Sequence, residues 1–211
     1  MKLPHVHIAA TGVWLPEKIV SNHELAKSLD TTDEWIVSHT GIKNRHIAAP
    51  GETNASGSAA AAKVALERAG VAPAELGSII VATSTPDYMS LPSTACQVQH
   101  LIGANNNSGA FDLAAACTGF IYALQVARSL MVYDPRPVLV IGADLMTRIV
   151  DWKDRNLCVL FGDGAGAAVL KRTEREGGLT ESVLRSDGSG GDVLLREGGS
   201  RFPAGTPMSN P

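Results

Sequence analysis

The residue best placed to do chemistry in this sequence is Cys117, which lies within the segment AFDLAAACTGFIYAL at positions 110–124. This pattern predicts a strand that leads into small residues, then the cysteine, then a helix with Gly119 in its first turn. A sulfur at such a turn lies near unpaired helix N–H groups and the positive end of the helix dipole, which favour a thiolate. The backbone N–H of the same residue can point at a developing oxyanion. The segment therefore indicates a nucleophilic cysteine.

A second interpretation of Cys117 stays open, because free cysteine often packs as a small buried hydrophobe at the start of a helix. In favour of a nucleophile, the alanines at positions 114–116 are small enough to let a substrate approach closely. The other cysteines, Cys96 and Cys158, fall within a predicted helix and a predicted strand, where we expect core roles. Three widely spaced cysteines make no disulfide framework, so all three are expected to be free thiols.

Several other polar residues are expected to be structural. The segment FGDGAGA at positions 161–167 resembles a phosphate-binding loop but lacks the Lys-Ser/Thr pair such a loop needs, so we expect a tight turn beside the pocket. Asp112, five positions before Cys117, is expected to be a buried, hydrogen-bonded carboxylate. Five histidines show no metal-ligand spacing, so no metal site is expected; they are His5, His7, His23, His46 and His100.

The order of the predicted elements indicates an α/β fold in which helices cover a mostly parallel, mixed sheet. Short apolar runs predict strands at 7–13, 78–84, 109–113 and 138–142, a closing pair at 157–161 and 166–170 joined by the turn GDGA, and a last strand within 179–188. Periodicity and caps predict helices at 23–30 (after Asn22), 33–40 (from Thr31 or Thr32 to Gly41), 54–69, 93–103 and 118–131.

Bulk composition narrows the class of protein. The chain has 211 residues, of which 45% are hydrophobic and 18% charged, as is ordinary for a soluble globular protein. A net charge of −3 gives no basic footprint for nucleic acid. No stretch approaches the roughly 20 apolar residues of a membrane span, and the N-terminus, interrupted by Pro4, His5 and His7, does not resemble a secretory signal. We therefore expect a cytoplasmic protein without nucleic-acid or membrane partners.

Five segments together resemble the beta-ketoacyl-acyl-carrier-protein synthase III family, in the family's order and spacing, over about residues 5–195. The central segment is AFDLAAACTGF, which contains Cys117. The other four are DEWIVSHTGIKNRHIAAPGET (33–53), LPSTACQVQHLIG (91–103), DRNLCVLFGDGAGAAVL (154–170) and SDGSGGD (186–192). Five matches in register are far more specific than any single motif.

The resemblance implies a thiolase-like fold, of which the chain carries only the first of two duplicated halves, and a ping-pong reaction. Cys117 would take an acyl group, typically acetyl, from coenzyme A and then condense with malonyl on acyl carrier protein, with loss of carbon dioxide. This condensation initiates bacterial type II fatty acid synthesis. Acyl-coenzyme A is then a substrate, so no cofactor is expected. The implied partners are acyl-coenzyme A, malonyl-acyl carrier protein and a second copy of the chain in a homodimer.

The resemblance also assigns four binding residues. Trp35 and Arg155 would sandwich the adenine of coenzyme A between two flat groups, and Thr31 would hydrogen-bond the adenine edge. Leu91 would enter the acyl pocket of the partner subunit, and a leucine there implies a short or modestly branched primer. Plainer roles stay open for the four: a half-buried aromatic, a solvated turn residue, a helix cap and dimer-core packing, respectively.

One position departs from the family pattern. His39 stands where the family often has an arginine near the phosphates of coenzyme A, and histidine is mostly neutral at pH 7. Either the affinity for coenzyme A is weaker as a result, or Lys43 and Arg45 supply the charge.

The family mechanism also needs a histidine and an asparagine from the second half of the chain, and no motif of either kind occurs in this sequence. We expect residues 1–172 to form the N-terminal thiolase-like half and residues 173–211 to begin the connection to a second half, without which an apolar face would be exposed. Three explanations stay open: a partial sequence, completion of the fold by another chain, or a natural half without catalysis. The functional alternatives are a specialised relative with a quinolone or polyketide-type starter, and a half-domain that acts in dimerisation.

Overall fold

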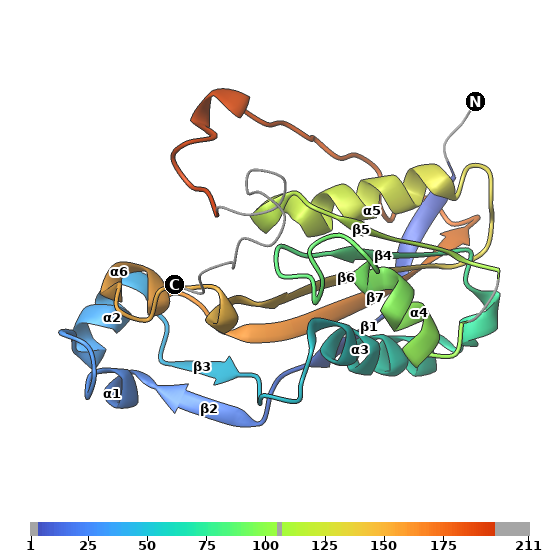
Figure 1. Ribbon diagram of the computed structural model, residues 1–211. Coiled ribbons are helices and arrows are strands. Elements are labelled where there is room, and N and C mark those ends of the chain that lie inside the picture. Colours follow the sequence, from blue (N-terminus) through green and yellow to red (C-terminus); the bar gives the residue numbers. More distant parts are fainter. Residues whose placement is uncertain (1–3, 105–106, 197–211) are drawn as a thin grey trace.

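The computed structural model describes residues 4–104 and 107–196, whose main feature is a five-stranded sheet between two helical layers (Figure 1). The strands of this sheet are β1 (His5–Trp14), β4 (Ser78–Ala82), β5 (Gly109–Leu113), β6 (Val138–Leu145) and β7 (Asp163–Thr173). The helices are α1 (Asn22–Leu25), α2 (Asp33–Thr40), α3 (Asn54–Ala69), α4 (Thr94–Leu101), α5 (Gly119–Leu130) and α6 (Arg155–Cys158).

The sheet is mixed, as predicted, with the strand order β1-β7-β6-β4-β5. β4 pairs in parallel with β5 and β6, whereas β7 pairs antiparallel with both β6 and β1. Among the described residues, parallel pairing is therefore confined to β5, β4 and β6, so the sheet is evenly mixed rather than mostly parallel as expected. Because parallel strands end at the same edge of a sheet, the loops that follow these three strands meet there.

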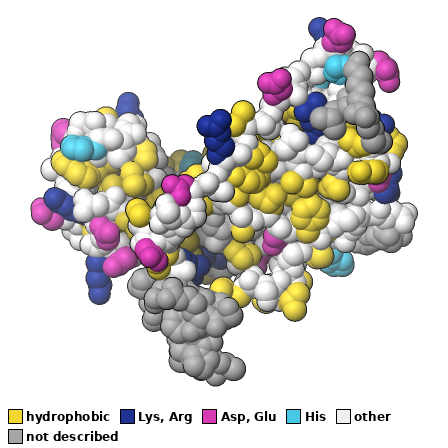
Figure 2. Space-filling view, turned by 90° about the horizontal axis from the view of Figure 1, so that it is seen from above, with side chains coloured by type: hydrophobic (Ala, Val, Ile, Leu, Met, Phe, Trp, Pro, Cys, Tyr) yellow, Lys and Arg dark blue, Asp and Glu magenta, His cyan; other side chains and the backbone are white. Residues whose placement is uncertain are grey.

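The two faces of the sheet are covered by different helices (Figure 1). The alanine-rich α3 and the neighbouring α4 pack on one face, and α5 packs on the other. Close approach depends on glycine: a Cβ at Gly12 would meet the Ala61 carbonyl at 2.2 Å, and one at Gly142 would meet Phe120 at 3.2 Å. The α5 side keeps an apolar hollow of about 370 Å³, and Figure 2 shows hydrophobic side chains gathered on the molecule's upper surface.

A separate small lobe stands at one end of the sheet (Figure 1). It contains α1, α2, α6 and an antiparallel pair that the sequence did not predict, β2 (Lys18–Ser21) with β3 (Asn44–Ile47). Its own buried cluster consists of Val20, Leu25, Ile36, Val150, Cys158 and Val159. We call these elements the small lobe.

Helix caps explain which predicted helices are confirmed. Thr32 accepts a hydrogen bond from the Trp35 N–H and Gly41 ends α2 in the left-handed conformation, as predicted. The prediction of a helix at 23–30 capped by Asn22 is wrong, because α1 ends at Leu25 and Ser21 is its cap. The side chain of Asn22 is fully buried and hydrogen-bonds elsewhere, so it cannot cap a helix.

Two strand predictions and one turn prediction near the C-terminal end are wrong, whereas the strand predicted at 166–170 is confirmed as part of β7. Residues 157–161 do not form a strand, because Asp154 caps α6 there; short apolar runs do not distinguish helix from strand. The predicted turn GDGA lies at the start of β7, where Asp163 pairs with Leu145 of an extended β6. Residues 179–188 form no strand, and this segment instead crosses α5 and hydrogen-bonds to Tyr122 and Arg128.

The expected division at residue 172 remains a prediction. β7 ends at Thr173, next to that boundary, and residues 197–211 of the expected connection lie outside the described residues. In the part of the chain that the structure describes, no helix is both long and apolar enough to cross a membrane.

Candidate active site and ligand clamp

Cys117 lies on a tight turn between β5 and α5. Residues Ala116–Thr118 form a single 3-10 turn, in which the Thr118 hydroxyl donates to the Ala115 carbonyl at 2.8 Å. Ala116 has φ of +44°, and no other non-glycine residue in the described ranges has a positive φ. The side chain of Cys117 is exposed, which excludes the alternative of a buried core cysteine. This strained turn therefore presents the sulfur outward at the N-terminal end of α5.

Asp112 fixes the strand that leads to Cys117. Its two carboxylate oxygens accept the backbone N–H groups of Thr94 and Ala95 at 2.7 and 2.8 Å, so they satisfy the first turn of α4. The prediction of a hydrogen-bonded carboxylate is confirmed, although Asp112 is half-buried rather than fully buried. The contact ties β5 to α4 on the edge of the sheet where Cys117 lies.

Asp144 orders the neighbouring loop and was not identified from the sequence. One carboxylate oxygen accepts from the hydroxyls of Thr83 and Thr85 and from the backbone N–H of Ser84. Consequently β4 ends at Ala82, two residues before the predicted end. The available signal was the Thr-Ser-Thr sequence that directly follows a buried strand, since such residues bond to nearby carboxylates and backbone groups.

The other two cysteines differ from each other. Cys158 is fully buried, as expected for a core residue, and burial raises the pKa of its thiol. It lies in α6 rather than in the predicted strand. The core role predicted for Cys96 is wrong, because this side chain faces solvent from α4 with its sulfur 3.6 Å from the Ala110 carbonyl oxygen. Cys96 is thus a natural control for the reactivity of Cys117.

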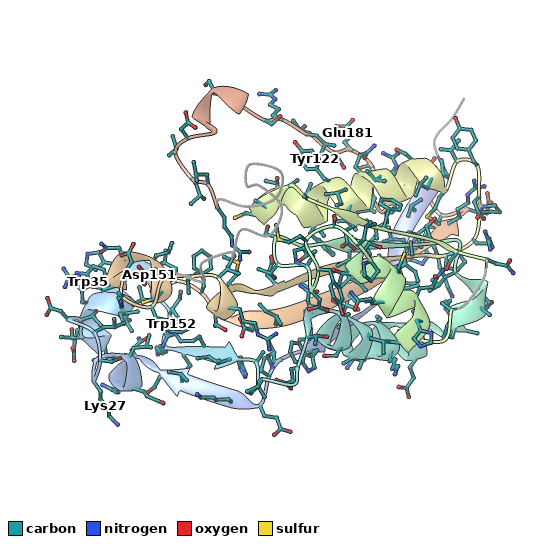
Figure 3. All side chains as sticks on the ribbon, in the orientation of Figure 1. Lys27, Trp35, Tyr122, Asp151, Trp152 and Glu181 are labelled. Carbon is teal, nitrogen blue, oxygen red and sulfur yellow. The ribbon has the colours of Figure 1, made fainter. Side chains whose placement is uncertain are left out.

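The small lobe brings together two residues that are 120 positions apart. The guanidinium carbon of Arg155 lies 5.5 Å from the centre of the Trp35 ring, within the range of a cation–π contact. Arg155 also donates to the Asp30 carbonyl, and its nitrogen lies 3.4 Å from the Asp30 carboxylate. Figure 3 labels Trp35 in the small lobe, together with Trp152. We call Trp35 and Arg155 the clamp.

Two further residues adjoin Trp35. The imidazole of His39 stacks on the indole with ring centres 4.4 Å apart, and its Nδ1 hydrogen-bonds to the Trp35 carbonyl oxygen at 2.8 Å. The hydroxyl of Thr31 is buried without a hydrogen-bond partner among residues 4–104 and 107–196. Since Thr32 is the cap of α2, the alternative of a helix cap for Thr31 is excluded. A buried hydroxyl without a partner is costly, and a ligand that bonds to it would remove that cost.

The suggestion that Arg45 supplies charge to a bound phosphate is wrong. Its side chain is only 4% exposed and donates to internal acceptors, and burial lowers its pKa. Lys43 is exposed and stays a candidate for that role.

Leu91 is 83% exposed on the loop between β4 and α4, close in sequence to the exposed side chains of Tyr88 and Met89. Within the described ranges, no three His, Cys, Asp or Glu side chains group as a metal site.

Comparisons with known proteins show which proteins this chain resembles. The family described as 3-oxoacyl-[acyl-carrier-protein (ACP)] synthase III matches residues 111–188. A beta-ketoacyl-[acyl-carrier-protein] synthase III of Caldanaerobacter subterraneus subsp. tengcongensis is 52% identical over 201 residues, which are 93% of this chain and 60% of the relative. The chain therefore spans about 60% of the length of such relatives.

Solved structures share the fold. The synthase III of Thermus thermophilus superposes with a TM-score of 0.86 at 40% identity, over 97% of this chain and 63% of that protein. The priming beta-ketosynthase of the R1128 polyketide biosynthetic pathway superposes with a TM-score of 0.76, also at 40% identity, over 83% of this chain and 53% of that protein.

Proposed function

This chain belongs to the beta-ketoacyl-acyl-carrier-protein synthase III family, to whose N-terminal portion it corresponds, and on that basis we propose that Cys117 accepts an acyl group from acyl-coenzyme A. The fold is the thiolase-like fold predicted from the sequence. The observation that carries the proposal is the exposed sulfur of Cys117 on a strained turn at the start of α5. Thiolates attack thioesters readily, and this position is open to solvent.

In the proposed first step, the Cys117 thiolate attacks the thioester carbonyl of acetyl-coenzyme A or another short acyl-coenzyme A. A new sulfur–carbon bond forms, the carbonyl electrons move onto oxygen, and collapse of this oxyanion expels the coenzyme A thiolate, which takes up a proton. The N-terminal end of α5 favours both negative charges. The acyl-enzyme then condenses with malonyl-acyl carrier protein, whose decarboxylation supplies the carbanion. This reaction would initiate type II fatty acid synthesis in the cytoplasm.

The clamp supports coenzyme A as the acyl donor. Trp35 and Arg155 offer a flat aromatic face and a flat cation, which suit the two faces of a planar base. The Thr31 hydroxyl, which has no hydrogen-bond partner in the described part of the chain, lies next to α2 and could bond to the edge of that base. Binding through the nucleotide end would leave the acyl end free to reach the sulfur.

Exposure of Leu91 supports a homodimer in which this side chain enters the acyl pocket of the partner subunit. At 83% exposed, Leu91 is among the most exposed large apolar side chains of the described residues, and exposed apolar loops mark interaction surfaces. We propose that its size limits the primer to short or modestly branched acyl groups. Exchange of Leu91 for phenylalanine should then restrict the accepted primers to shorter acyl groups.

Labelling with radioactive acetyl-coenzyme A tests the central proposal. The protein should gain about one acetyl group per chain. Peptide mapping should place it on Cys117, and Cys117→Ser should remain unlabelled. Cys96→Ser is the matched control, because Cys96 is also an exposed free thiol, and this variant should label like the wild type. A label on Cys96 would overturn the assignment of the nucleophile to Cys117. The absence of any label on a folded protein would also overturn the proposal, and it would favour a half-domain that acts in dimerisation.

A specialised relative is the second candidate. The observation in its favour is the structural match to the R1128 priming beta-ketosynthase, which is as identical in sequence as the Thermus synthase III. Primer profiling separates the two candidates: acetyl-coenzyme A as the best donor favours initiation of fatty acid synthesis, and a distinct starter favours a polyketide or quinolone type.

A further inference from the structure

Arg45 is a buried cation that the chemistry at Cys117 does not use. It lies on β3 in the small lobe and is only 4% exposed. In the described part of the chain no carboxylate forms an ion pair with it. Burying an arginine without such a partner is expensive, and an apolar residue of similar volume is often the more stabilising choice. Stability alone therefore does not explain why this residue is an arginine.

The contacts of Arg45 suggest another reason. Its guanidinium nitrogens donate to the Val20 carbonyl at 3.1 Å, to the Asn22 side-chain oxygen at 2.6 Å and to the Val159 carbonyl at 3.4 Å. These acceptors belong to β2, to α1 and to the end of α6, respectively. A guanidinium carries five donors in a fixed plane, so it can hold three separate elements at once.

One path leads from Arg45 to Trp35. Asn22, whose oxygen accepts from Arg45, is itself fully buried and donates to the Asp33 carboxylate at 2.9 Å and to the Ile42 carbonyl at 2.7 Å. Asp33 is the first residue of α2, and Trp35 follows in the same turn. The position of α2, and with it the indole, is thus tied to Arg45 through one intervening amide.

The other path leads from Arg45 to Arg155. Val159 directly follows α6, the one-turn helix that begins with Arg155. The backbone is also closely packed at Gly162, where a Cβ would meet the Arg45 Cβ and the His46 carbonyl oxygen at 3.1 Å each. Both halves of the clamp are therefore anchored on one buried guanidinium. The label of Trp35 in Figure 3 marks the position of the small lobe.

We propose that Arg45 is the positioning residue of the clamp: it touches no ligand and fixes the elements that carry Trp35 and Arg155, the two side chains between which a planar base would bind. This inference rests on the proposed function, because the base is the adenine of coenzyme A. Elements held by hydrogen bonds, rather than by packing alone, keep their orientation when the ligand leaves. The cost of burying Arg45 is then offset because the backbone that carries the clamp is already oriented before the ligand binds.

Two neighbouring acids give the first test. Asp33→Ala cuts the link from Asn22 to α2, and Glu34→Ala is its matched control, because Glu34 is an exposed first-turn acid of the same helix. Both variants lose the same favourable charge at the helix start, but only the first loses the link. We expect Asp33→Ala to bind coenzyme A about fivefold more weakly by calorimetry and Glu34→Ala to bind like the wild type.

Arg45 variants give the second test. Arg45→Lys keeps the charge but not the planar fork, and we expect about tenfold weaker binding of coenzyme A. Acylation of Cys117 by S-acetylpantetheine, a donor without adenine, should proceed at the wild-type rate in the same variant. A defect with both donors would mean that Arg45 only maintains the fold, and this would overturn the inference.

The outcomes separate the inference from the proposed function. If the wild type does not bind coenzyme A, the proposed function fails first. If the wild type binds and both Asp33→Ala and a folded Arg45→Lys bind equally well, the proposed function stands and the positioning role is wrong. If Arg45→Lys does not fold, the comparison of Asp33→Ala with Glu34→Ala still tests the positioning role. Asp33 is only half-buried at the start of α2, so its replacement should leave the protein folded.

Discussion

The guanidinium carbon of Arg155 lies 5.5 Å from the centre of the Trp35 indole. A planar base held between them needs about 3.5 Å on each side, or about 7 Å in total. Without a ligand the two side chains therefore lie too close together for a base, and binding must separate them by roughly 1.5 Å or more while the elements that carry them stay in place. Since the Arg155 side chain is partly exposed, with exposed Asp30 as its ion-pair partner, this side of the clamp can move at low cost.

Removal of the indole should weaken binding of the nucleotide end alone. Base–aromatic stacking contributes about 1–3 kcal/mol, so Trp35→Ala should bind coenzyme A at least about fivefold more weakly than the wild type by calorimetry. The affinity of Trp35→Phe should lie between those of the wild type and Trp35→Ala. The control is Trp152→Phe, because Trp152 is a tryptophan of the same region whose indole N–H donates to the Thr147 carbonyl. An equal loss with pantetheine, which has no adenine, would contradict a stacking role.

Replacement of the Thr31 hydroxyl should separate stability from binding. This hydroxyl is buried and has no hydrogen-bond partner in the described residues, so Thr31→Val should leave the free energy of unfolding unchanged or raise it by up to about 1 kcal/mol. Affinity for coenzyme A should nevertheless fall several-fold. Thr32→Val, which removes the cap of α2, should instead destabilise the protein by about 1 kcal/mol. Urea denaturation and calorimetry measure the two effects; a destabilised Thr31→Val with normal affinity would contradict the assignment.

Glycine at position 116 should stabilise the turn before Cys117. Ala116 has φ of +44°, a conformation that glycine adopts without the steric cost of a Cβ. We expect Ala116→Gly to raise the free energy of unfolding by up to about 1 kcal/mol, and Ala116→Val to lower it. Ala114→Gly, at an exposed alanine without positive φ, should lower stability slightly because the unfolded chain gains entropy. Equal signs for the two glycine variants in urea denaturation would exclude strain at Ala116.

Local signals in the sequence predicted the elements that carry Trp35 and Cys117. Caps and periodicity placed α2 between Thr32 and Gly41, and the bounds of β5 agree with the expected 109–113. The strands β2 and β3 were not predicted, because a strand of four residues is too short to show the alternation of apolar and polar residues. Their pairing depends on contacts with the rest of the small lobe.

Long-range contacts were beyond the reach of pattern analysis. Only family resemblance linked Trp35 with Arg155, since no spacing rule relates positions so far apart. Burial of Arg45 was also unexpected, because arginine is rarely buried without a charged partner. What buries it is the convergence of β2, α1 and the end of α6, and this convergence exists only in the folded chain.

Stability should depend on pH through Asp134. Hydrogen bonds from the Arg136 side chain, followed by one from its backbone N–H, hold the pKa of the Asp134 carboxyl below its ordinary value of 3.8. A lowered pKa means that the ionised form is preferred in the folded state, so the stabilisation is complete above pH 3.8 and is lost as pH falls through the folded-state pKa.

Asp134→Asn should therefore lower the Tm at pH 7, and the difference from the wild type should disappear in strong acid. Asp192→Asn, at an exposed position, is the control and should change the Tm little. Thermal unfolding followed by circular dichroism between about pH 2 and pH 7, a range that spans the ordinary Asp pKa, measures both. A Tm difference that persists unchanged in acid would show that the pair contributes by packing rather than by charge.

The open edge of β5 is where a second copy of the chain should bind. β5 is the last strand of the sheet, no other strand in the described residues pairs with its outer edge, and Phe111 is 37% exposed on it. Its one charged side chain, Asp112, is occupied at the start of α4, so the edge lacks the charges that usually prevent pairing. Two copies related by a twofold axis could pair their β5 strands antiparallel and bury Phe111. Sedimentation should show a dimer for the wild type and a monomer for Phe111→Lys. Tyr133→Lys is the control and should remain a dimer, because Tyr133 is an exposed aromatic residue outside β5. A dimer that survives Phe111→Lys would place the interface elsewhere.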